Sequence, residues 1–470
     1  MDVSYMLHEM CHNVLSAADI KAIGKSRGFS AKEIATPALL ANFFLSPIGV
    51  QTALQSLSRE EVAFLYFLKE HGQEIGIAPF SRIYGDASTG KKWYHGTFTQ
   101  RYQHTLRQVK KALVRKGVLL MAEQVNGGDT KMERWRFRFP PEFEAFLPPL
   151  LFDAIALEAP GDYQEDVVRT KLLKITAGRS AKPTLDPIQY AWKFKDGALF
   201  MGLEPYSVQR LEAWQNACWQ ASIPGKKRVW SPQETASDKA RVYTSIQATV
   251  YALAQLGPSE WASPQQLTPV FKVFCNRDAL GEDVCEAGWR WGRLARQEVD
   301  GRMLYRLAPA LSAPASELDP ASYLRSPTGH FLEIDLETIP YQALAELNQL
   351  THLEVIEQRL LAKPNFITAG RAPASVRNGP LAQWLRSNAS GFKQMFEQLD
   401  KRWGKQIIHE NLMLARVKDL SLKVRIEKSL GTKGVVSLSD EFIAFPVGLA
   451  PKVRRIVGQA DFAVKEVSAS

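Results

Sequence analysis

The hydrophobic pattern of the chain opens with helices. Apolar residues recur at helical spacing over residues 15–27 and stop at a glycine, the residue type that commonly ends a helix. Residues 58–71 form a longer amphipathic run, in which Ser58 stands three positions before Glu61 as in a capping box. We therefore expect a helical N-terminal segment, 1–55, followed by the first helix of a new domain.

A basic helix and two strands complete this domain. Helical spacing predicts a short turn of helix near 79–84 and a long basic helix over 99–116. The runs 118–124 and 133–140 predict two strands, because the loop between them contains an Asn-Gly pair that favours a tight turn. Three helices followed by a hairpin is the element order of a winged helix, so we predict one over residues 56–150.

The same element order recurs over residues 239–312. Helices are expected at 244–257, 264–274 and 281–291, and acidic residues open the third of them. A hairpin is expected at 294–308, where an Asp-Gly pair separates two alternating runs. The sequence thus predicts two winged helices in tandem.

The remaining segments do not repeat this element order. Residues 151–238 have two helical patterns and a polar connector, and we expect a helical bridge without an assigned function. After a linker rich in Pro, Ser and Ala, residues 326–470 alternate strand and helix patterns, with single strands expected at 353–361 and 462–467. The predicted fold class is α+β and predominantly helical, with tandem winged-helix domains followed by a small α/β domain.

Positive charge gathers in the first predicted winged helix. The chain has a net charge of +10, and residues 97–140 hold ten Lys or Arg against three acidic residues. A helix can enter the major groove of a duplex while cations around it neutralise phosphates. We therefore predict contacts from the polar face of the basic helix and from one side of the second strand, where arginines alternate with aromatic residues. The candidate DNA-binding residues are Arg101, His104, Arg107, Lys111, Arg115, Arg134, Arg136 and Arg138.

Two alternatives stay open for these basic residues. A basic helix face can simply be solvated, and a winged helix can dock another protein instead of DNA. In the second copy, Arg290, Arg293, Arg302 and Arg306 could reach phosphate, but the third helix opens with acids and carries two tryptophans. For that copy, protein docking and DNA contact are both open.

One string near the N-terminus matches a zinc-hydrolase motif. His8, Glu9 and His12 spell H-E-x-x-H, which places two zinc-binding histidines one helical turn apart. The extended motif would need Gly and His where Leu15 and Ala18 stand, and the apolar stripe of this helix leaves both histidines on its polar side. We expect a packing helix without metal.

A second weak pattern is the acidic run EIDLE. Its three carboxylates, Glu333, Asp335 and Glu337, share one strand face, which is the kind of acid cluster that nucleases use. The simpler interpretation is a solvated strand face. We expect neither a catalytic residue nor a cofactor in the chain.

Composition limits the cellular setting. The sequence has no apolar run of 18 residues and no basic, apolar leader, so we expect neither a membrane partner nor a secretion signal. Its four cysteines lie far apart and form no C-x-x-C pair, which favours a reduced, cytoplasmic protein.

Parts of the chain resemble known families. LSAADIKAIGKSRGF loosely resembles the SAP motif, a small helix–loop–helix DNA-binding element, although a plain packing helix is the alternative. Residues 326–470 resemble the N-terminal helicase-associated domain of bacterial XPB-type helicase proteins. The similar segments are FLEIDLETIPYQALAEL, LEVIEQRLLAKPNFITAGRAPASVRNG, GFKQMFEQL, GKQIIHENL and the terminal stretch from ARVKD to VKEV. Members of that family often carry winged-helix-like units upstream.

The resemblance implies an accessory role without the helicase motor. The motor needs a P-loop, G-x-x-x-x-G-K-[ST], and the sequence has no such run and no DEAH-like box. We therefore expect a non-catalytic protein that binds double-stranded DNA beside a separate helicase, nuclease or methyltransferase, in genome maintenance or defence. The alternative is a protein-interaction scaffold that makes no direct DNA contact.

Overall fold

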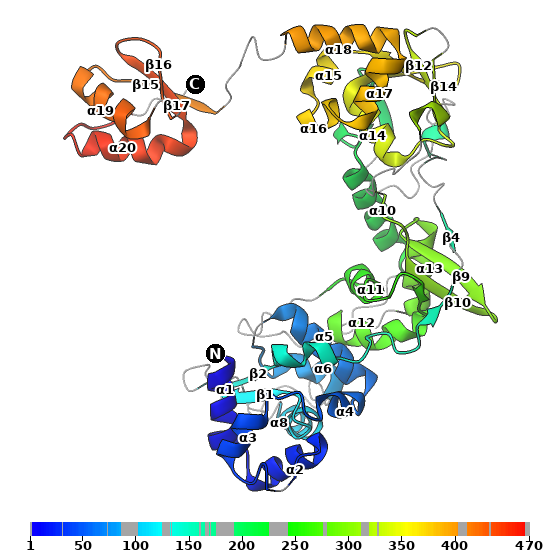
Figure 1. Cartoon of the computed structure of the whole chain (residues 1–470), viewed down its shortest axis with the longest axis vertical. Coiled ribbons are helices and arrows are strands. Elements are labelled where there is room, and N and C mark those ends of the chain that lie inside the picture. Colours follow the sequence, from blue (N-terminus) through cyan, green and yellow to red (C-terminus); the bar gives the residue numbers. More distant parts are fainter. Residues whose placement is uncertain are drawn as a thin grey trace, which may run out of the picture. The chain divides into compact units, whose positions relative to one another are not determined.

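The computed structural model has mixed α and β structure with small antiparallel sheets (Figure 1). The chain divides into two compact units, Met1–Lys393 and Gln394–Ser470. No helix in the described ranges is both long and apolar enough to cross a bilayer. The structure describes residues 2–30, 32–72, 74–85, 102–124, 132, 134–158, 161–164, 169, 171–174, 192–224, 243–275, 280–311, 319–326, 329–402, 411–431 and 434–465.

The first helix–hairpin region runs from α5 to β2. Its first helix begins with the expected capping box, in which Ser58 and Glu61 exchange side chain–backbone hydrogen bonds. Met121 pairs with Phe137 across the antiparallel strands, and Ile75 bridges to the other edge of Phe137. The second strand therefore lies between the first strand and the segment that precedes the second helix. The elements are α5 (Arg59–His71), η2 (Ala78–Phe80), α6 (Ser81–Tyr84), α8 (Gln103–Val109), the π-helical turn η3 (Lys110–Val114), β1 (Leu120–Glu123) and β2 (Trp135–Arg138).

The second helix–hairpin region, from α11 to β10, repeats this plan. Thr244 and Gln247 form a capping box at its start. Asp300 and Gly301 make the tight turn of the hairpin with φ of 50° and 72°. Ala262 bridges to Tyr305, as Ile75 does to Phe137 in the first region. The elements are α11 (Ser245–Leu253), β8 (Glu260–Trp261), η6 (Pro264–Leu267), α12 (Thr268–Phe274), α13 (Gly281–Arg290), β9 (Leu294–Val299) and β10 (Arg302–Leu307).

The N-terminal helices pack onto the first helix–hairpin region. Met6, Met10 and Cys11 are fully buried, and the elements that carry them contact β1. Helix α2 (Ala17–Arg27) ends at Gly28, whose φ of 73° is the left-handed conformation that glycine adopts readily. The expected apolar stripe and helix end are thus confirmed. The elements are α1 (Val3–Glu9), the π-helical turn η1 (Met10–Val14), α2 (Ala17–Arg27), α3 (Pro37–Phe43) and α4 (Val50–Gln55).

The two helix–hairpin regions share one hydrophobic core. Helix α5 of the first packs against α12 of the second, and the rings of Phe67 and Phe274 meet edge to face at 5.3 Å. Arg82 donates a hydrogen bond of 2.7 Å to the carbonyl of Val273. The regions are therefore joined by packing as well as by the chain.

The segment 151–238, expected to be a helical bridge, contains strands as well as helix. Its longest helix is the expected one, but a hairpin precedes it, with Asp196 and Gly197 at its turn (φ 50° and 74°). The correction has a clear signal, because WKFKDGALFM holds an Asp-Gly pair between alternating residues. The polar connector expected at 222–239 lies outside the described residues from 225 onward. The elements are β3 (Ile155–Ala156), β4 (Asp162–Tyr163), β5 (Trp192–Lys195), β6 (Ala198–Met201), β7 (Glu204–Pro205) and α10 (Val208–Ser222).

The end of the first unit is a four-stranded antiparallel sheet, ordered β11-β12-β14-β13, followed by helices. The single strand expected at 353–361 is wrong, because Glu357 and Gln358 turn the chain with φ of 48° and 69°. Neither residue type commonly adopts the left-handed conformation, so no turn was expected at this position. The elements are β11 (Leu324–Arg325), β12 (Leu332–Ile334), α14 (Tyr341–Leu350), β13 (Thr351–Ile356), β14 (Arg359–Pro364), α15 (Phe366–Arg371), α16 (Ala374–Arg377) and α17 (Pro380–Asn388).

The unit Gln394–Ser470 has a three-stranded antiparallel sheet with β17 in the middle. The expected strand at 462–467 is wrong for its described part, because residues 462–465 lie in no strand. Alternating apolar residues create a strand only where a neighbouring strand pairs with them. The helix expected in GKQIIHENL falls almost wholly outside the described residues. The elements are α18 (Ser390–Arg402), which begins in the first unit, β15 (Leu412–Arg416), α19 (Leu420–Leu430), β16 (Val436–Ser437), β17 (Phe442–Pro446), η8 (Val447–Leu449) and α20 (Ala450–Gly458).

Candidate nucleic-acid interface

The polar face of the basic helix is exposed. Val109 and Leu113 of α8 and η3 are fully buried. His104, Arg107 and Lys111 lie on the other side of the helix and are exposed. Their spacing of three and four residues places them on one stripe. The structure thus brings three of the eight candidate residues together on an open helix face.

Arg115 lies on the same helix but is held by a carboxylate from α2. Its Nε lies 2.7 Å from Oδ1 of Asp19, and Nζ of Lys110 lies 2.8 Å from Oδ2. The Asp19 side chain is 1% exposed. Burial opposes its ionisation, but hydrogen bonds from Lys110, Ser16 and Arg115 outweigh burial and hold the pKa of Asp19 well below its usual value. Arg115 therefore fastens the helix to the N-terminal segment.

A buried arginine fastens the end of the same helix. Arg27 is 1% exposed and its guanidinium donates four hydrogen bonds to backbone carbonyls. The distances are 2.6 Å to Ile48, 3.1 Å to Phe44, 2.8 Å to Gly117 and 2.6 Å to Ser46. Burial lowers the pKa of Arg27 to about 10. Because Gly117 lies three residues after the end of η3, this network anchors the turn that follows the basic helix.

The three arginines of the second strand are less open than the sequence suggested. The expected alternation is present, since Phe137 is fully buried and Arg134, Arg136 and Arg138 are partly exposed. In the pairing of the strands, however, Arg136 and Arg138 stand beside Ala122 and Leu120. Both of those residues are fully buried, and α1 and η1 are the elements that contact β1 there. The N-terminal segment therefore covers much of the arginine side.

Two further observations complete the account of the eight candidate residues. Arg136 also donates a hydrogen bond of 3.2 Å from Nε to Oε1 of Gln124. Arg101 lies outside the described residues. The candidate interface is therefore the stripe His104, Arg107 and Lys111, which we call the basic stripe.

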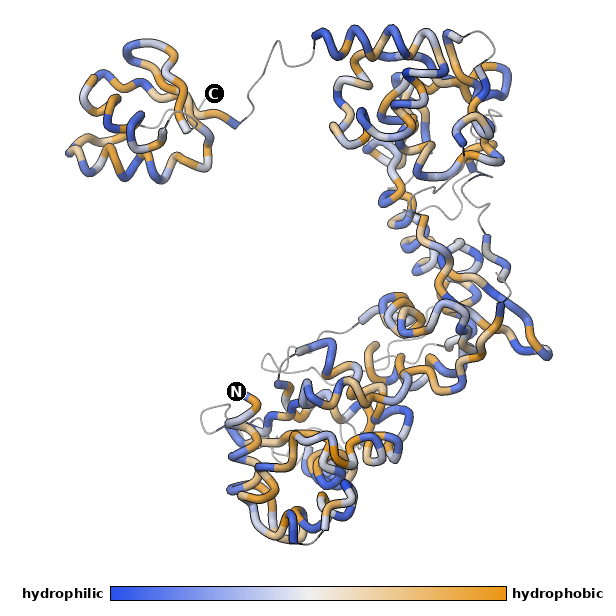
Figure 2. The backbone as a smooth tube through the Cα atoms, in the orientation of Figure 1, coloured by the Kyte–Doolittle hydropathy of each residue, from blue (hydrophilic) through white to orange (hydrophobic). Residues whose placement is uncertain are grey.

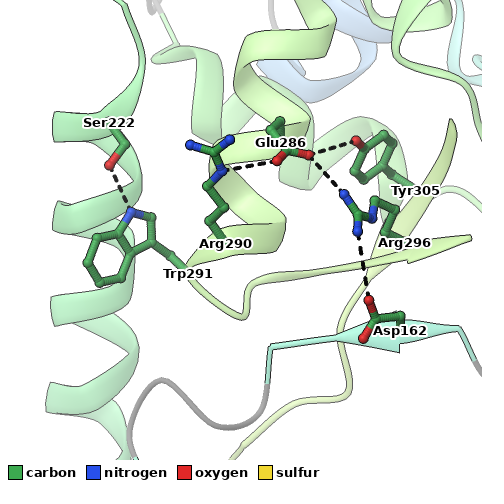
Figure 3. A network of polar contacts seen from close by, with 7 residues as sticks. All are labelled: Asp162, Ser222, Glu286, Arg290, Trp291, Arg296 and Tyr305. Carbon is green, nitrogen blue, oxygen red and sulfur yellow. Dashed lines mark hydrogen bonds and ion pairs between the residues drawn. The ribbon is translucent and has the colours of Figure 1, made fainter. Parts of the chain in front are cut away.

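The third helix of the second region has a different surface. Glu286 of α13 accepts hydrogen bonds from Nε of Arg290 at 3.0 Å, from Nη1 of Arg296 at 3.3 Å and from the hydroxyl of Tyr305 at 3.4 Å (Figure 3). Arg296 also lies 3.9 Å from Asp162 and stacks over Trp289. These arginines are thus matched by Glu286 of the same region and by Asp162 of β4.

Two further arginines of this region are also engaged. Arg293 lies 3.6 Å from Glu212 of α10, and Arg306 donates a hydrogen bond of 2.7 Å to the carbonyl of Pro258. Of the four cations that could have reached phosphate, Arg290, Arg293 and Arg306 therefore have partners within the protein.

The zinc-like motif lies on the surface. His8 and His12 are exposed, and their ring centroids are 4.4 Å apart, while Cys11 between them is fully buried. Burial raises the pKa of the Cys11 thiol to about 12, which keeps it protonated. In the part of the chain that the structure describes, no group of three His, Cys, Asp or Glu side chains is placed to hold a metal ion.

The acids of EIDLE line a small hollow of about 280 Å³ in the first unit. Two of them face cations, because Glu333 lies 3.4 Å from Arg359 and Asp335 lies 4.0 Å from Arg325. The expected shared strand face is wrong, because only Glu333 lies in a strand, β12, while Asp335 follows its end and Glu337 lies in a turn. The two ion pairs account for Glu333 and Asp335.

Sequence reasoning missed the residues that anchor the basic helix. Asp19 could have been noticed, because Ser16 stands three positions before it as in a capping box. Nothing local marks Arg27 as buried, since its partners are carbonyls of residues 44–48 and of Gly117. A scan against protein-family models and a search of curated proteins gave no match to this chain.

Proposed function

We propose that this protein is a non-catalytic accessory protein that binds double-stranded DNA through the basic stripe of its first helix–hairpin region. The observation that carries the proposal is the exposure of Arg107 and Lys111 on one helix face, in a segment with ten Lys or Arg against three acids. Exposed cations on a helix that fits the major groove give affinity by releasing counterions from DNA.

The element order supports a winged-helix interpretation of both regions. Each has a capped first helix, a bridging residue before a proline-started second helix, a third helix and a hairpin. In a winged helix, the third helix is the one that enters the groove. We assign DNA contact to the first copy, whose third helix carries the basic stripe.

The second copy favours a protein partner. Its residues 280–307 hold five arginines and five acids, and the exposed side of α13 includes Glu282 and Glu286. Such a balanced surface offers phosphate no net attraction. We propose that it docks another DNA-processing protein, such as a helicase, a nuclease or a methyltransferase. If both copies dock proteins, the chain is an interaction scaffold, which is the second candidate function.

The test is duplex binding measured against salt by fluorescence anisotropy. The logarithm of the binding constant should fall linearly with the logarithm of the salt concentration, by about 0.9 for each phosphate contact. Arg107→Glu with Lys111→Glu should lower that slope by about 2. The matched control, Arg107→Lys with Lys111→Arg, keeps the charge and should keep the slope. Binding that is absent, or insensitive to salt, would favour the scaffold.

A further inference from the structure

The two helices of the unit Gln394–Ser470 carry six of the 13 Lys and Arg residues in this part of the sequence. Helix α19 exposes Arg425 and Lys428, and α20 exposes Lys452 and Arg455. Their apolar residues, among them Ile426, are buried in the core of the unit. Figure 2 shows hydrophilic and hydrophobic turns alternating along α20. Each helix therefore turns an apolar side inward and a basic side outward.

One acid offsets these cations within the two helices. It is Glu427, which lies 3.7 Å from Nζ of Lys423. Lys423 is 5% exposed and also donates a hydrogen bond to the carbonyl of Ser439. Glu427 is thus paired with a buried lysine on the inner side of the helix, so the exposed cations are not balanced by an acid of their own helices.

The basic residues of the two helices lie on neighbouring surfaces. Nζ of Lys452 in α20 donates a hydrogen bond of 2.9 Å to the carbonyl of Ser429 in α19, and the two helices contact each other. Beside that contact is a shallow hollow of about 530 Å³ on α19, lined by the hydroxyl-bearing Ser421 and Ser429 and by Arg425 and Lys428. Hydroxyls together with cations are the usual side-chain ligands of phosphate oxygens.

The opposite side of this unit has another character. The strands expose Leu414 at 63%, Val436 at 54% and Leu438 at 57%, and the one cation of β15, Arg416, lies 2.6 Å from Glu441. The three strands therefore carry no cation beyond this ion pair, whereas the two helices expose several. A polyanion fits the helical side better than a protein surface of mixed charge does.

We propose that the exposed side of α19 and α20 is a second nucleic-acid contact surface, which binds the sugar-phosphate backbone without reading bases. It takes the same ligand as the basic stripe and in that respect rests on the proposed function. It would double the phosphate contacts of the chain and hold the nucleic acid in a sequence-independent way.

The experiment compares full-length variants by salt titration of binding to duplex DNA of mixed sequence. Arg425→Glu with Lys428→Glu removes the α19 cations, and Lys452→Glu with Arg455→Glu removes those of α20. Each pair should lower the salt slope by about 2. Lys418→Glu with Lys465→Glu makes the same charge change outside both helices and should leave the slope within error. Circular dichroism melting should show that all variants fold, because every residue changed is exposed.

The outcomes separate this inference from the proposed function. A lowered slope for the helix variants but not for Arg107→Glu with Lys111→Glu supports the second surface and sinks the basic stripe. The reverse result overturns the second surface and leaves the basic stripe standing. Equal slopes for the helix variants and the Lys418 and Lys465 control also overturn it, and would assign this side to an acidic protein partner.

Discussion

The two helix–hairpin regions of the first unit share a plan and differ in what surrounds their cations. In the first, Arg107 and Lys111 stand exposed on the third helix. In the second, Arg290 and Arg296 are bound by Glu286 of the same helix. The same element order therefore presents a basic surface in one copy and a balanced one in the other. A repeated fold does not repeat a binding surface, because function depends on the partners of each charge.

The two regions also differ in the contacts by which a helix from outside each region, α2 or α10, holds the third helix of that region. In the first region, α2 holds α8 and η3 through charged and polar contacts of Asp19 and Arg27. In the second, α10 holds α13 through aromatic side chains, since Trp219 donates a hydrogen bond to the carbonyl of Val284. Trp291, next to α13, donates another to Ser222 of α10 (Figure 3). Polar support in one copy is replaced by aromatic support in the other.

The largest expected effect is on the polar support of the first region. Arg27→Met should lower the free energy of unfolding by about 4 kcal/mol, because four backbone carbonyls, two of them in buried hydrogen bonds, lose their donor. Trp219→Phe, which removes one hydrogen bond of the aromatic support, should lower it by about 1 kcal/mol. Urea denaturation measures both. A loss for Arg27→Met as small as that for Trp219→Phe would show that the two supports do not differ.

A smaller effect depends on pH. The pKa of Asp19 is lower in the folded than in the unfolded protein, so its ionised form stabilises the fold above the unfolded pKa of about 4 and is lost as pH falls below it. Asp19→Asn should therefore lower the free energy of unfolding by about 2 kcal/mol at pH 7, since Lys110 and Arg115 lose their partner. The difference from wild type should shrink as the pH falls below about 4.

Thermal melts across that pH range check this linkage. Asp162→Asn is a suitable control, because its carboxylate is exposed and lies 3.9 Å from Arg296 in the second region. It should give a small difference at every pH. A constant gap between wild type and Asp19→Asn would contradict the role given to the Asp19 carboxylate.

The smallest effect concerns charge balance in the second region. Glu286→Gln should lower stability by about 1 kcal/mol, since the pairs with Arg290 and Arg296 are partly exposed. It should also raise duplex affinity slightly at low salt, because two arginines lose their acid. Anisotropy titration beside urea denaturation measures both changes. Weaker DNA binding would mean that Glu286 supports a contact surface instead of neutralising one.

Local sequence patterns predicted much of the secondary structure of this chain. The capping box at Ser58, the helix start at Thr244 and the Asp-Gly turn at Asp300 depend on neighbouring residues, and all three are present. The hairpin turn at Glu357 and Gln358 was missed, because neither residue type favours the left-handed conformation. Prediction failed where the deciding contact was not local.

The candidate site shows the same limit. Helical spacing placed Arg107 and Lys111 on an exposed face, but it could not foresee that Arg115 meets Asp19, a residue 96 positions away. Strand alternation correctly placed the arginines on the side opposite Phe137. It could not predict that the N-terminal helices pack beside these arginines. Periodicity predicts which side of an element is polar, and only tertiary packing decides whether that side meets solvent.

Hydrogen exchange of the full chain, with and without duplex DNA, tests the difference between the two regions most directly. Peptides covering Gln103–Val114 of the first region and Gly281–Arg290 of the second would be compared in one experiment. We expect DNA to slow amide exchange in the first set and to leave the second unchanged. Equal protection of both sets, or protection of Gly281–Arg290 alone, would contradict the assignment of DNA contact to the basic stripe.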